Sequence, residues 1–339
     1  MSDGRKFEFN WPFFGNRHII DFLQTGILSR QLSHFYIFAG APDLGKGTLA
    51  WQLAASILCR NFADGKGILP CGECFNCQEL KKNSHSGLTY LETLEGKKNI
   101  SVEQVRDFIH LMNLGSFGGD FKIGIIKSGE KLSLEAANAL LKTLEEPKPG
   151  VTIILLTAAL EQLPATIISR GQVLTFRPVA REQIHDYLIA EHKVARSAAR
   201  SLAKIACGRP ALAAKFATEP KYLTDRRKIS AALIKIMSGT TGEKLRLTEE
   251  FLAGSEATAE KRNFTEVLEI WQALARDLLL VRLGLEELAA DEEIIAELKK
   301  INLPLATLRE LPEKIGQGMK YYAANVSPKM IVENISLQI

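Results

Sequence analysis

The chain has 339 residues, of which 46% are apolar and 24% charged, a composition typical of a globular protein with two or three domains. Its 43 basic and 39 acidic residues give a formal net charge of +4, which is too balanced to indicate nucleic-acid binding by itself. No stretch reaches the about 18 uncharged apolar residues that a membrane-spanning helix requires, and the N-terminus lacks the apolar core of a secretory signal. We therefore expect a cytoplasmic protein without a membrane partner.

The first half of the chain alternates between strand patterns and helix patterns. Strand patterns cover residues 34–40, 88–94, 121–127 and 151–160, and helix patterns cover residues 48–59, 101–114 and 134–146. Strands that are apolar along their whole length and alternate with helices are typical of a parallel sheet covered on both faces. The sequence therefore predicts an α/β domain.

The strand signal ends at about Arg177, and the rest of the chain has helix patterns. They cover residues 181–193, 195–206, 209–217 and 260–284, and residues 218–225 are predicted to form a break. The last helix should begin at Ser327 and Pro328, because a cap residue followed by proline is a common helix start. Apolar residues recur at helical spacing within 260–284 and should be mostly core; they are Phe264, Val267, Leu268, Trp271, Leu274, Leu278 and Val281.

A phosphate-binding loop, GAPDLGKGT, spans residues 40–48 between a predicted strand and a predicted helix. Gly40, Gly45 and Lys46 keep the backbone amides and the ammonium group that attract phosphate at a helix N-terminus. Gly47, however, stands where a Ser or Thr normally binds magnesium. Thr48 comes one position late and points in another direction around the helix. The loop predicts weak nucleotide binding or none, so ATP is a doubtful cofactor.

The strand at 121–127 ends without the acidic residue that a P-loop ATPase uses to hold magnesium. Lys127 and Ser128 occupy the strand end, and a cation there cannot bind a second cation. Glu130 lies two residues further along, in the following turn, and is a poor substitute. We expect no ATP hydrolysis by this chain alone.

Four of the five cysteines lie between residues 59 and 77, and the run CGECFNC contains two C-x-x-C steps. In a reducing compartment this spacing favours a metal over disulfides. It predicts a structural zinc site with four thiolate ligands and no open position for water. The alternative is a set of incidental thiols or a redox pair. The predicted ligands are Cys59, Cys71, Cys74 and Cys77.

The segment EAANALLKTLEEP at 135–147, with VTIILLTAALEQLPATIISRGQ at 151–172, resembles the AAA+ subunits of the bacterial DNA polymerase III clamp loader. The four-cysteine insert is shared by the delta-prime and the gamma/tau subunits of that family. Segments 15–42 and 325–337 are similar to delta-prime sequences. Gamma/tau subunits keep an intact ATP site, whereas delta-prime subunits commonly lose it, so the resemblance favours the delta-prime type.

The resemblance implies three parts in the chain. They are an AAA+ P-loop domain at 1–177 with the zinc insert at about 59–77, a small three-helix lid at 178–220, and a helical collar for assembly at 221–339. The resemblance also identifies Asp43 as a departure from glycine, which puts a carboxylate beside the phosphate position. At ~5 Å and an effective dielectric of ~20, each unit of like charge there costs about 3 kcal/mol.

The resemblance further implies a role for Arg170, which lies in SRG where the family has Ser-Arg-Cys. This arginine would present its guanidinium to ATP bound on a neighbouring subunit, because a planar, permanently charged group can bridge phosphate oxygens. The alternative is a solvent-exposed arginine at a helix end. Thr157 matches the family's polar sensor position but is equally explained as a strand-end hydroxyl, and Arg209 matches its lid arginine.

The partners that the resemblance implies are the gamma/tau and delta subunits, the sliding clamp, and primed DNA bound through the assembled hetero-oligomer. Part of the apolar stripe in 260–284 would then belong to the collar interface. One alternative is an active AAA+ ATPase, such as a divergent gamma/tau subunit. Another is a zinc-dependent nucleic-acid-binding module that has no part in clamp loading.

Overall fold

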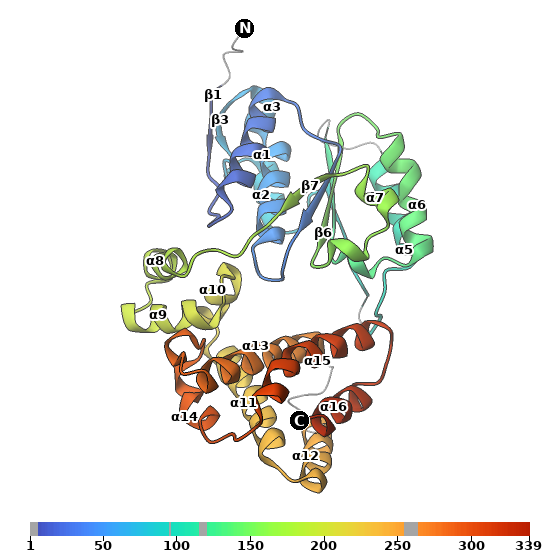
Figure 1. Cartoon of the computed structure of the whole chain (residues 1–339). Coiled ribbons are helices and arrows are strands. Elements are labelled where there is room, and N and C mark those ends of the chain that lie inside the picture. Colours follow the sequence, from blue (N-terminus) through green and yellow to red (C-terminus); the bar gives the residue numbers. More distant parts are fainter. Residues whose placement is uncertain (1–5, 95, 115–120, 254–263) are drawn as a thin grey trace. The chain divides into compact units, whose positions relative to one another are not determined.

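The computed structural model describes residues 6–94, 96–114, 121–253 and 264–339 (Figure 1). Its internal contacts group the chain into two units. The sheet unit comprises Met1–Ala180 and Arg209–Ala211, and the helical unit comprises Arg181–Gly208 and Leu212–Ile339. The sheet unit ends close to the boundary predicted at residue 177, and the further division at residue 220 stays a prediction.

A five-stranded parallel sheet forms the centre of the sheet unit, in the order β4-β5-β6-β2-β7. Its strands are β2 (Phe35–Ala39), β4 (Leu88–Leu91), β5 (Lys122–Ile126), β6 (Val151–Thr157) and β7 (Gln172–Thr175). The last residue of β2, Ala39, lies opposite Thr157 on β6 and Thr175 on β7. Because neighbouring parallel strands end at the same edge, the segments that follow β2, β5 and β6 are brought together there.

Helices cover both faces of this sheet (Figure 1). They are α1 (Arg17–Ser29), α2 (Lys46–Leu58), α3 (Arg60–Asp64), α4 (Phe75–Lys81), α5 (Val102–Asn113), α6 (Leu134–Glu145) and α7 (Ala165–Ile168). Alternate side chains of β2 enter opposite layers: Tyr36 and Phe38 pack with α1 and α2, whereas Phe35 and Ile37 pack with α5 and α6. The α/β fold predicted from the sequence is confirmed.

Two strand features were not predicted from the sequence. The strand β7 has four residues and follows a turn, so its pattern is too short to be distinguished from a loop. A separate parallel pair joins β1 (Lys6–Phe9) to β3 (Lys66–Leu69), with Phe9 opposite Leu69. Both strands are mostly exposed or half-buried, and β3 contains Gly67, which weakens a strand signal.

The chain from residue 181 onward is helical, as predicted. Its helices are α8 (Arg181–His192), α9 (Arg196–Ile205), α10 (Pro210–Thr218), α11 (Pro220–Ser238), α12 (Thr241–Ala253), α13 (Phe264–Arg282), α14 (Ile295–Leu298), α15 (Leu305–Ala323) and α16 (Pro328–Leu337), with the single turns η3 (Glu286–Leu288) and η4 (Glu292–Ile294). Among the helices that the structure describes, none has the length and apolar character needed to cross a membrane.

The predicted break at 218–225 is wrong, because α11 begins at Pro220. Proline is favoured in the first turn of a helix, where its missing N–H has no partner to lose, so the break narrows to the cap residue Glu219. The predicted start of the last helix is confirmed, since Ser327 is the N-cap and Pro328 the first helical residue of α16. Of the predicted helix at 260–284, residues 260–263 lie outside the described residues.

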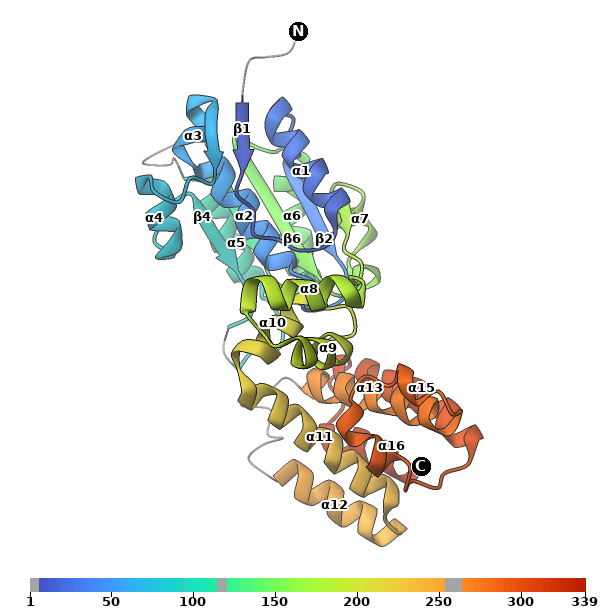
Figure 2. The ribbon, with the colours of Figure 1, turned by 90° about the vertical axis from the view of Figure 1, so that its left-hand side faces the viewer.

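The helical unit has a core in which α13 lies beside α15 (Figure 2). The apolar stripe predicted within 260–284 faces this core, and all seven of its residues are at most 7% exposed. Buried in their own chain, these side chains are not available to a partner. An interface on the helical unit would therefore need other residues.

A buried acid, Asp277 on α13, holds the segment that carries η3 and η4. One carboxylate oxygen accepts a hydrogen bond from the Ala290 amide at 2.9 Å, and the other lies 3.8 Å from the Arg276 guanidinium without a hydrogen bond. Burial raises the pKa of Asp277 above its usual value. On the same segment, Asp291 accepts a hydrogen bond at 3.0 Å from Arg227 of α11.

We expect Asp277→Asn to change how stability depends on pH. Because the folded pKa is raised above the unfolded value of 3.8, the free energy of unfolding of the wild type falls as pH rises from that value through the folded pKa. The asparagine keeps an acceptor for Ala290 and does not ionise. The stability of the variant relative to wild type should therefore rise between pH 4 and pH 8, by on the order of 1 kcal/mol.

Urea unfolding across this pH range measures the effect, with Asp21→Asn as the control because Asp21 is exposed and its pair with Arg17 is at the surface. A difference between Asp277→Asn and wild type that is constant with pH would contradict the assignment.

Candidate functional site

The phosphate loop joins the end of β2 to the start of α2, as the sequence predicts. Gly45 is the N-cap of α2 with φ 87°, and Gly40 has φ 142°. A Cβ atom on Gly40 would lie 2.6 Å from the Phe176 carbonyl oxygen, and one on Gly45 would lie 2.5 Å from the Phe13 ring. Both glycines are therefore required by close contacts as well as by backbone conformation.

Lys46, the lysine of the phosphate loop, forms hydrogen bonds with carbonyl oxygens of the same loop. Lys46 Nζ donates to the carbonyl oxygen of Ala41 at 2.7 Å and also to that of Gly40. Burial lowers the pKa of Lys46, and the nearby carboxylates of Glu130 and Asp43 oppose that shift. A phosphate would have to replace these internal contacts of the ammonium group.

The remaining loop residues offer little to a metal-bound nucleotide. Asp43 is exposed and has φ 59°, a conformation that favours glycine, and its carbonyl oxygen accepts from the Ala211 amide at 3.1 Å. Ala211 belongs to the turn that contains Arg209 and is grouped with the sheet unit. Gly47 has no side-chain oxygen, and Thr48 is exposed on the first turn of α2.

At the end of β5, Lys127 stands where a P-loop ATPase has a magnesium-binding acid. Lys127 Nζ pairs with Glu92 Oε2 at 2.9 Å and lies 5.0 Å from the centre of the Tyr90 ring. Ser128 has φ 56° and begins the turn η1 (Gly129–Lys131). The lysine is thus held toward the neighbouring strand β4 by an ion pair and a cation–π contact.

The contact between Glu130 and Thr157 was not predicted from the sequence. Its Oε2 accepts from Thr157 Oγ1 at 2.8 Å and from the Ala158 amide at 3.3 Å. Thr157 Oγ1 also accepts from the Ala159 amide at 3.1 Å, so the buried hydroxyl is satisfied within the chain. The signal was available only indirectly: Glu130 follows β5, Thr157 ends β6, and adjacent parallel strands end at one edge.

Arg170 follows α7 and is held by its own chain. Its guanidinium donates to the Thr166 carbonyl oxygen at 2.8 Å and pairs with Glu145 of α6 at 2.5 Å, leaving 32% of the side chain exposed. A Cβ atom on Gly171 would lie 2.7 Å from Ile37 Cδ1. The glycine after Arg170 is therefore explained by the close approach of this turn to β2.

The four predicted ligand cysteines form one cluster. Their sulfur atoms all lie within 4.8 Å of one another, and the sulfurs of Cys71 and Cys77 are 3.9 Å apart. Cys59 ends α2, Cys71 follows β3, Cys74 is the N-cap of α4, and Cys77 lies in its first turn. Four thiolates at about 2.3 Å from a tetrahedral ion would be ~3.8 Å apart, so the donor set and its spacing fit a metal such as zinc.

Backbone amides support the sulfur atoms of this cluster. The amides of Cys71, Cys74 and Cys77 donate to the sulfurs of Cys59, Cys71 and Cys74 at 3.5, 3.4 and 3.5 Å. A hydrogen bond from the Cys77 thiol lowers the pKa of Cys59 to about 5, and the same bond raises the pKa of Cys77. A metal binds cysteine as the thiolate, so a thiophilic cation at this cluster would replace the thiol protons.

Basic residues follow one another at 81–82 and 226–228, and three of these side chains have local partners. Lys81 Nζ donates to the Gly72 carbonyl oxygen at 3.1 Å, and Lys82 pairs with Glu79 at 3.2 Å. Arg227 pairs with Asp291 and Glu293. These contacts favour structural or solvated roles for the three side chains.

Comparison with known proteins relates the chain to DNA polymerase III subunits. The family model described as "DNA polymerase III, delta subunit" matches residues 15–180. The delta' subunit of DNA polymerase III from Bacillus subtilis is 26% identical over 324 residues, which cover 95% of both chains. The delta' subunit from Pseudomonas aeruginosa is 36% identical over 140 residues, which cover 41% of this chain and 42% of that protein.

The tau subunit of DNA polymerase III from Salmonella typhimurium is 28% identical over 321 residues, which cover 93% of this chain and 47% of that protein. The chain thus spans about half the length, or less, of several curated relatives that it matches. A solved structure of a DNA polymerase III gamma subunit-related protein from Thermotoga maritima is similar at 17% identity and a TM-score of 0.44, covering 93% of this chain and 97% of that one.

We expect Asp43→Asn to raise the affinity of the isolated chain for magnesium-ATP, because it removes a like charge beside the phosphate position. The gain should be about tenfold or more. Asp43→Gly should gain at least as much, because glycine also adopts the positive φ of this position without strain. Titration with a fluorescent ATP analogue measures both.

Asp64→Asn on α3 is the control, since it removes an exposed carboxylate elsewhere in the sheet unit. Equal affinities for wild type and both Asp43 variants would show that the carboxylate does not limit binding.

Proposed function

Because the chain belongs to the family of DNA polymerase III clamp-loader subunits, we propose that it is a delta-prime-type subunit of that complex. In this role it would join gamma/tau and delta subunits in a hetero-oligomer that places the sliding clamp on primed DNA in the cytoplasm. One observation carries the proposal: the phosphate loop lacks its magnesium ligands, while Arg170 is retained with 32% of its side chain exposed.

The absent magnesium ligands argue against turnover by this chain. Gly47 provides no hydroxyl, and Lys127 provides a cation where an acid would be needed. Phosphoryl transfer depends almost entirely on positioning and charge stabilisation, so losing both metal contacts removes most of the catalytic effect. The Lys46 ammonium donates to loop carbonyl oxygens, and it cannot replace the two missing magnesium ligands.

Arg170 is suited to act on a neighbour's ATP. Breaking its surface pair with Glu145 would cost only about 0–1 kcal/mol. Bidentate contact with phosphate oxygens in a desolvated interface is worth more, since arginines of this kind contribute about 10³–10⁵ to turnover. Until such a phosphate is present, Glu145 and the Thr166 carbonyl oxygen hold the guanidinium in one orientation.

The relatives include both types of subunit, since the Bacillus subtilis delta' subunit matches 95% of this chain and the Salmonella typhimurium tau subunit matches 93%. Support for the delta-prime type therefore comes from the residues of the phosphate loop and of the end of β5. We propose a structural zinc ion for the cysteine cluster, held by all four thiolates. With four protein ligands it would stabilise the junction of α2, β3 and α4 and would have no hydrolytic role.

The rival candidate is an active AAA+ ATPase, and the position of Glu130 favours it. This carboxylate lies at the strand ends, bonded to Thr157, and acts electrostatically on Lys46. Magnesium-ATP turnover by the isolated chain that disappears in both Lys46→Ala and Glu130→Gln would support this candidate. It would also remove the proposed delta-prime role.

We expect Arg170→Ala to lower clamp loading by a complex reconstituted with gamma/tau and delta chains, sliding clamp and primed DNA. ATP turnover by the neighbouring site should fall by about tenfold or more, because the transition-state charge loses its guanidinium. Arg170→Lys should recover little, since lysine keeps the charge but lacks the planar pair of donors.

Arg60→Ala is the matched control, because Arg60 is 78% exposed on α3 and pairs only with Asp64 among the described contacts. Unchanged turnover in an assembled Arg170→Ala complex would contradict the proposed role.

We expect the purified chain to contain one zinc ion. Removal by a chelator should lower the unfolding midpoint by several degrees, since each kcal/mol lost shifts it by ~2–4 °C. Cys74→Ser should have a similar effect, whereas Cys207→Ser should not, because Cys207 lies outside the cluster. Metal analysis and thermal unfolding provide the measurements, and a metal-free chain with an unchanged midpoint would exclude a structural metal.

A further inference from the structure

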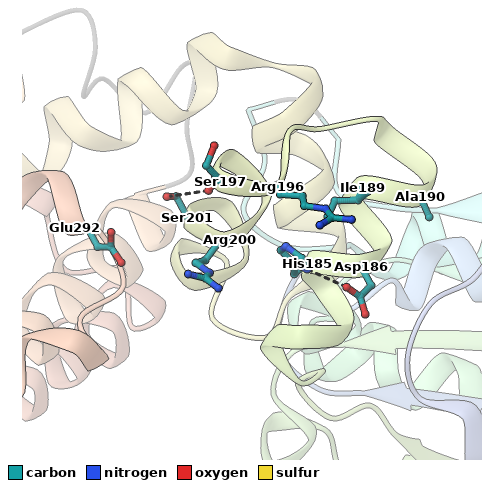
Figure 3. Close-up of a pocket in the computed structure, with 9 residues that line it drawn as sticks. All are labelled: His185, Asp186, Ile189, Ala190, Arg196, Ser197, Arg200, Ser201 and Glu292. Atoms are coloured by element: carbon teal, nitrogen blue, oxygen red, sulfur yellow. Dashed lines mark hydrogen bonds and ion pairs between the residues drawn. The ribbon is translucent and has the colours of Figure 1, made fainter.

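A cavity of about 800 Å³ lies on the helical unit, and none of its lining residues belongs to the phosphate loop, to the cysteine cluster or to the contacts of Arg170 (Figure 3). Helices α8 and α9 form most of its wall, and η4 contributes one residue. Its polar lining residues include His185, Arg196, Ser197, Arg200, Ser201 and Glu292. A cavity of this size can hold a nucleotide-sized molecule, since pockets for such ligands measure about 300–1,000 Å³.

Two arginines of α9 are available to a ligand in this cavity. Arg196 and Arg200 are one helical turn apart, so their side chains project from the same face. Both are exposed, and neither has a hydrogen-bond or ion-pair partner within the part of the chain that the structure describes. Figure 3 shows both guanidinium groups among the lining residues. Arginines that line a cavity and have no protein partner can bind a planar or tetrahedral anion.

Acidic and basic side chains are balanced in the lining, where Asp186 and Glu292 accompany Arg196 and Arg200. Glu292 is already engaged, because Lys204, one turn beyond Arg200, is bonded to it, and both Arg200 and Arg181 lie near enough to stabilise its charge. Asp186 is also engaged by His185 Nδ1 at 2.9 Å.

Hydroxyl groups lie beside these charges. Ser197 and Ser201 are on the same helix, and the Ser201 hydroxyl donates to the Ser197 carbonyl oxygen at 3.5 Å. The N-terminus of α9 begins at Arg196 without a side-chain cap, and the partial positive charge of a helix N-terminus favours an anion nearby. Ile189 and Ala190 of α8 supply an apolar part of the lining. Guanidinium groups, hydroxyl groups and a small apolar surface together suit a phosphorylated organic molecule.

We propose that this cavity binds a small ligand with two or more linked phosphate groups, such as a nucleoside diphosphate, through Arg196 and Arg200. A diphosphate carries more charge than Glu292, the carboxylate that now faces Arg200, and so competes with it. Two adjacent guanidinium groups also fit two linked phosphates better than one. This site shares no residue with the phosphate loop or with Arg170.

The test is calorimetric titration of the full chain with inorganic pyrophosphate, in a Lys46→Ala background that disables the phosphate loop. We expect saturable binding that weakens about tenfold or more in Arg196→Gln/Arg200→Gln, since each charged hydrogen bond is worth about a factor of ten. The control is Arg309→Gln/Lys320→Gln, which removes two exposed charges from α15 of the same unit. ADP in place of pyrophosphate should bind at least as tightly.

Several results would overturn the proposal. One is the absence of saturable pyrophosphate and ADP binding. Another is equal binding by Arg196→Gln/Arg200→Gln and the α15 control. A third is binding of duplex DNA that depends on the two arginines while pyrophosphate does not bind, which would assign the cations to a nucleic-acid backbone. Because Arg196 and Arg200 are exposed, both variants should fold, and circular dichroism checks this.

Discussion

The parallel pairing of β2 with β6 and of β6 with β5 is the constraint on which the site depends. It fixes three strand ends at one edge, so the phosphate loop, Glu130 and Thr157 share a small volume. Such an edge is where α/β proteins bind ligands, because helix N-termini and polar strand ends meet there. In this chain the same edge is filled by internal contacts. Lys46 binds loop carbonyls, and Glu130 accepts the Thr157 hydroxyl.

The fold separates the phosphate loop from Arg170, the residue that we propose acts on a neighbour's ATP. The loop side of the sheet lacks its magnesium ligands, while Arg170 lies after α7 on the connection between β6 and β7. That connection is short and is held by Glu145 of α6, so the guanidinium position depends on packing and not on a bound nucleotide. The missing magnesium ligands of the loop therefore do not disturb the position of the Arg170 guanidinium.

Much of the sheet unit could be predicted because its signals are local. Apolar runs such as 151–160 are long, and the loop glycines and the cysteine spacing are rigid patterns. The features that were not predicted correctly are contacts between residues far apart in sequence, or elements too short to give a clear pattern. The strand β7 is defined by pairing with β2, and the Glu130–Thr157 bond joins residues 27 apart in sequence. The break at 218–225 failed because Pro220 starts a helix instead of ending one.

The arrangement at the strand ends also explains why a single substitution would not restore a magnesium site. A hydroxyl at position 47 would still lack an acidic partner at the end of β5, where Lys127 is held near β4 by Glu92 and Tyr90. An acid at position 127 would lose both of those contacts and would add a negative charge close to Glu92. Asp43 would still oppose the phosphates. Each change is unfavourable until the others are present, so we expect that several residues of this edge would have to change together to create a magnesium site.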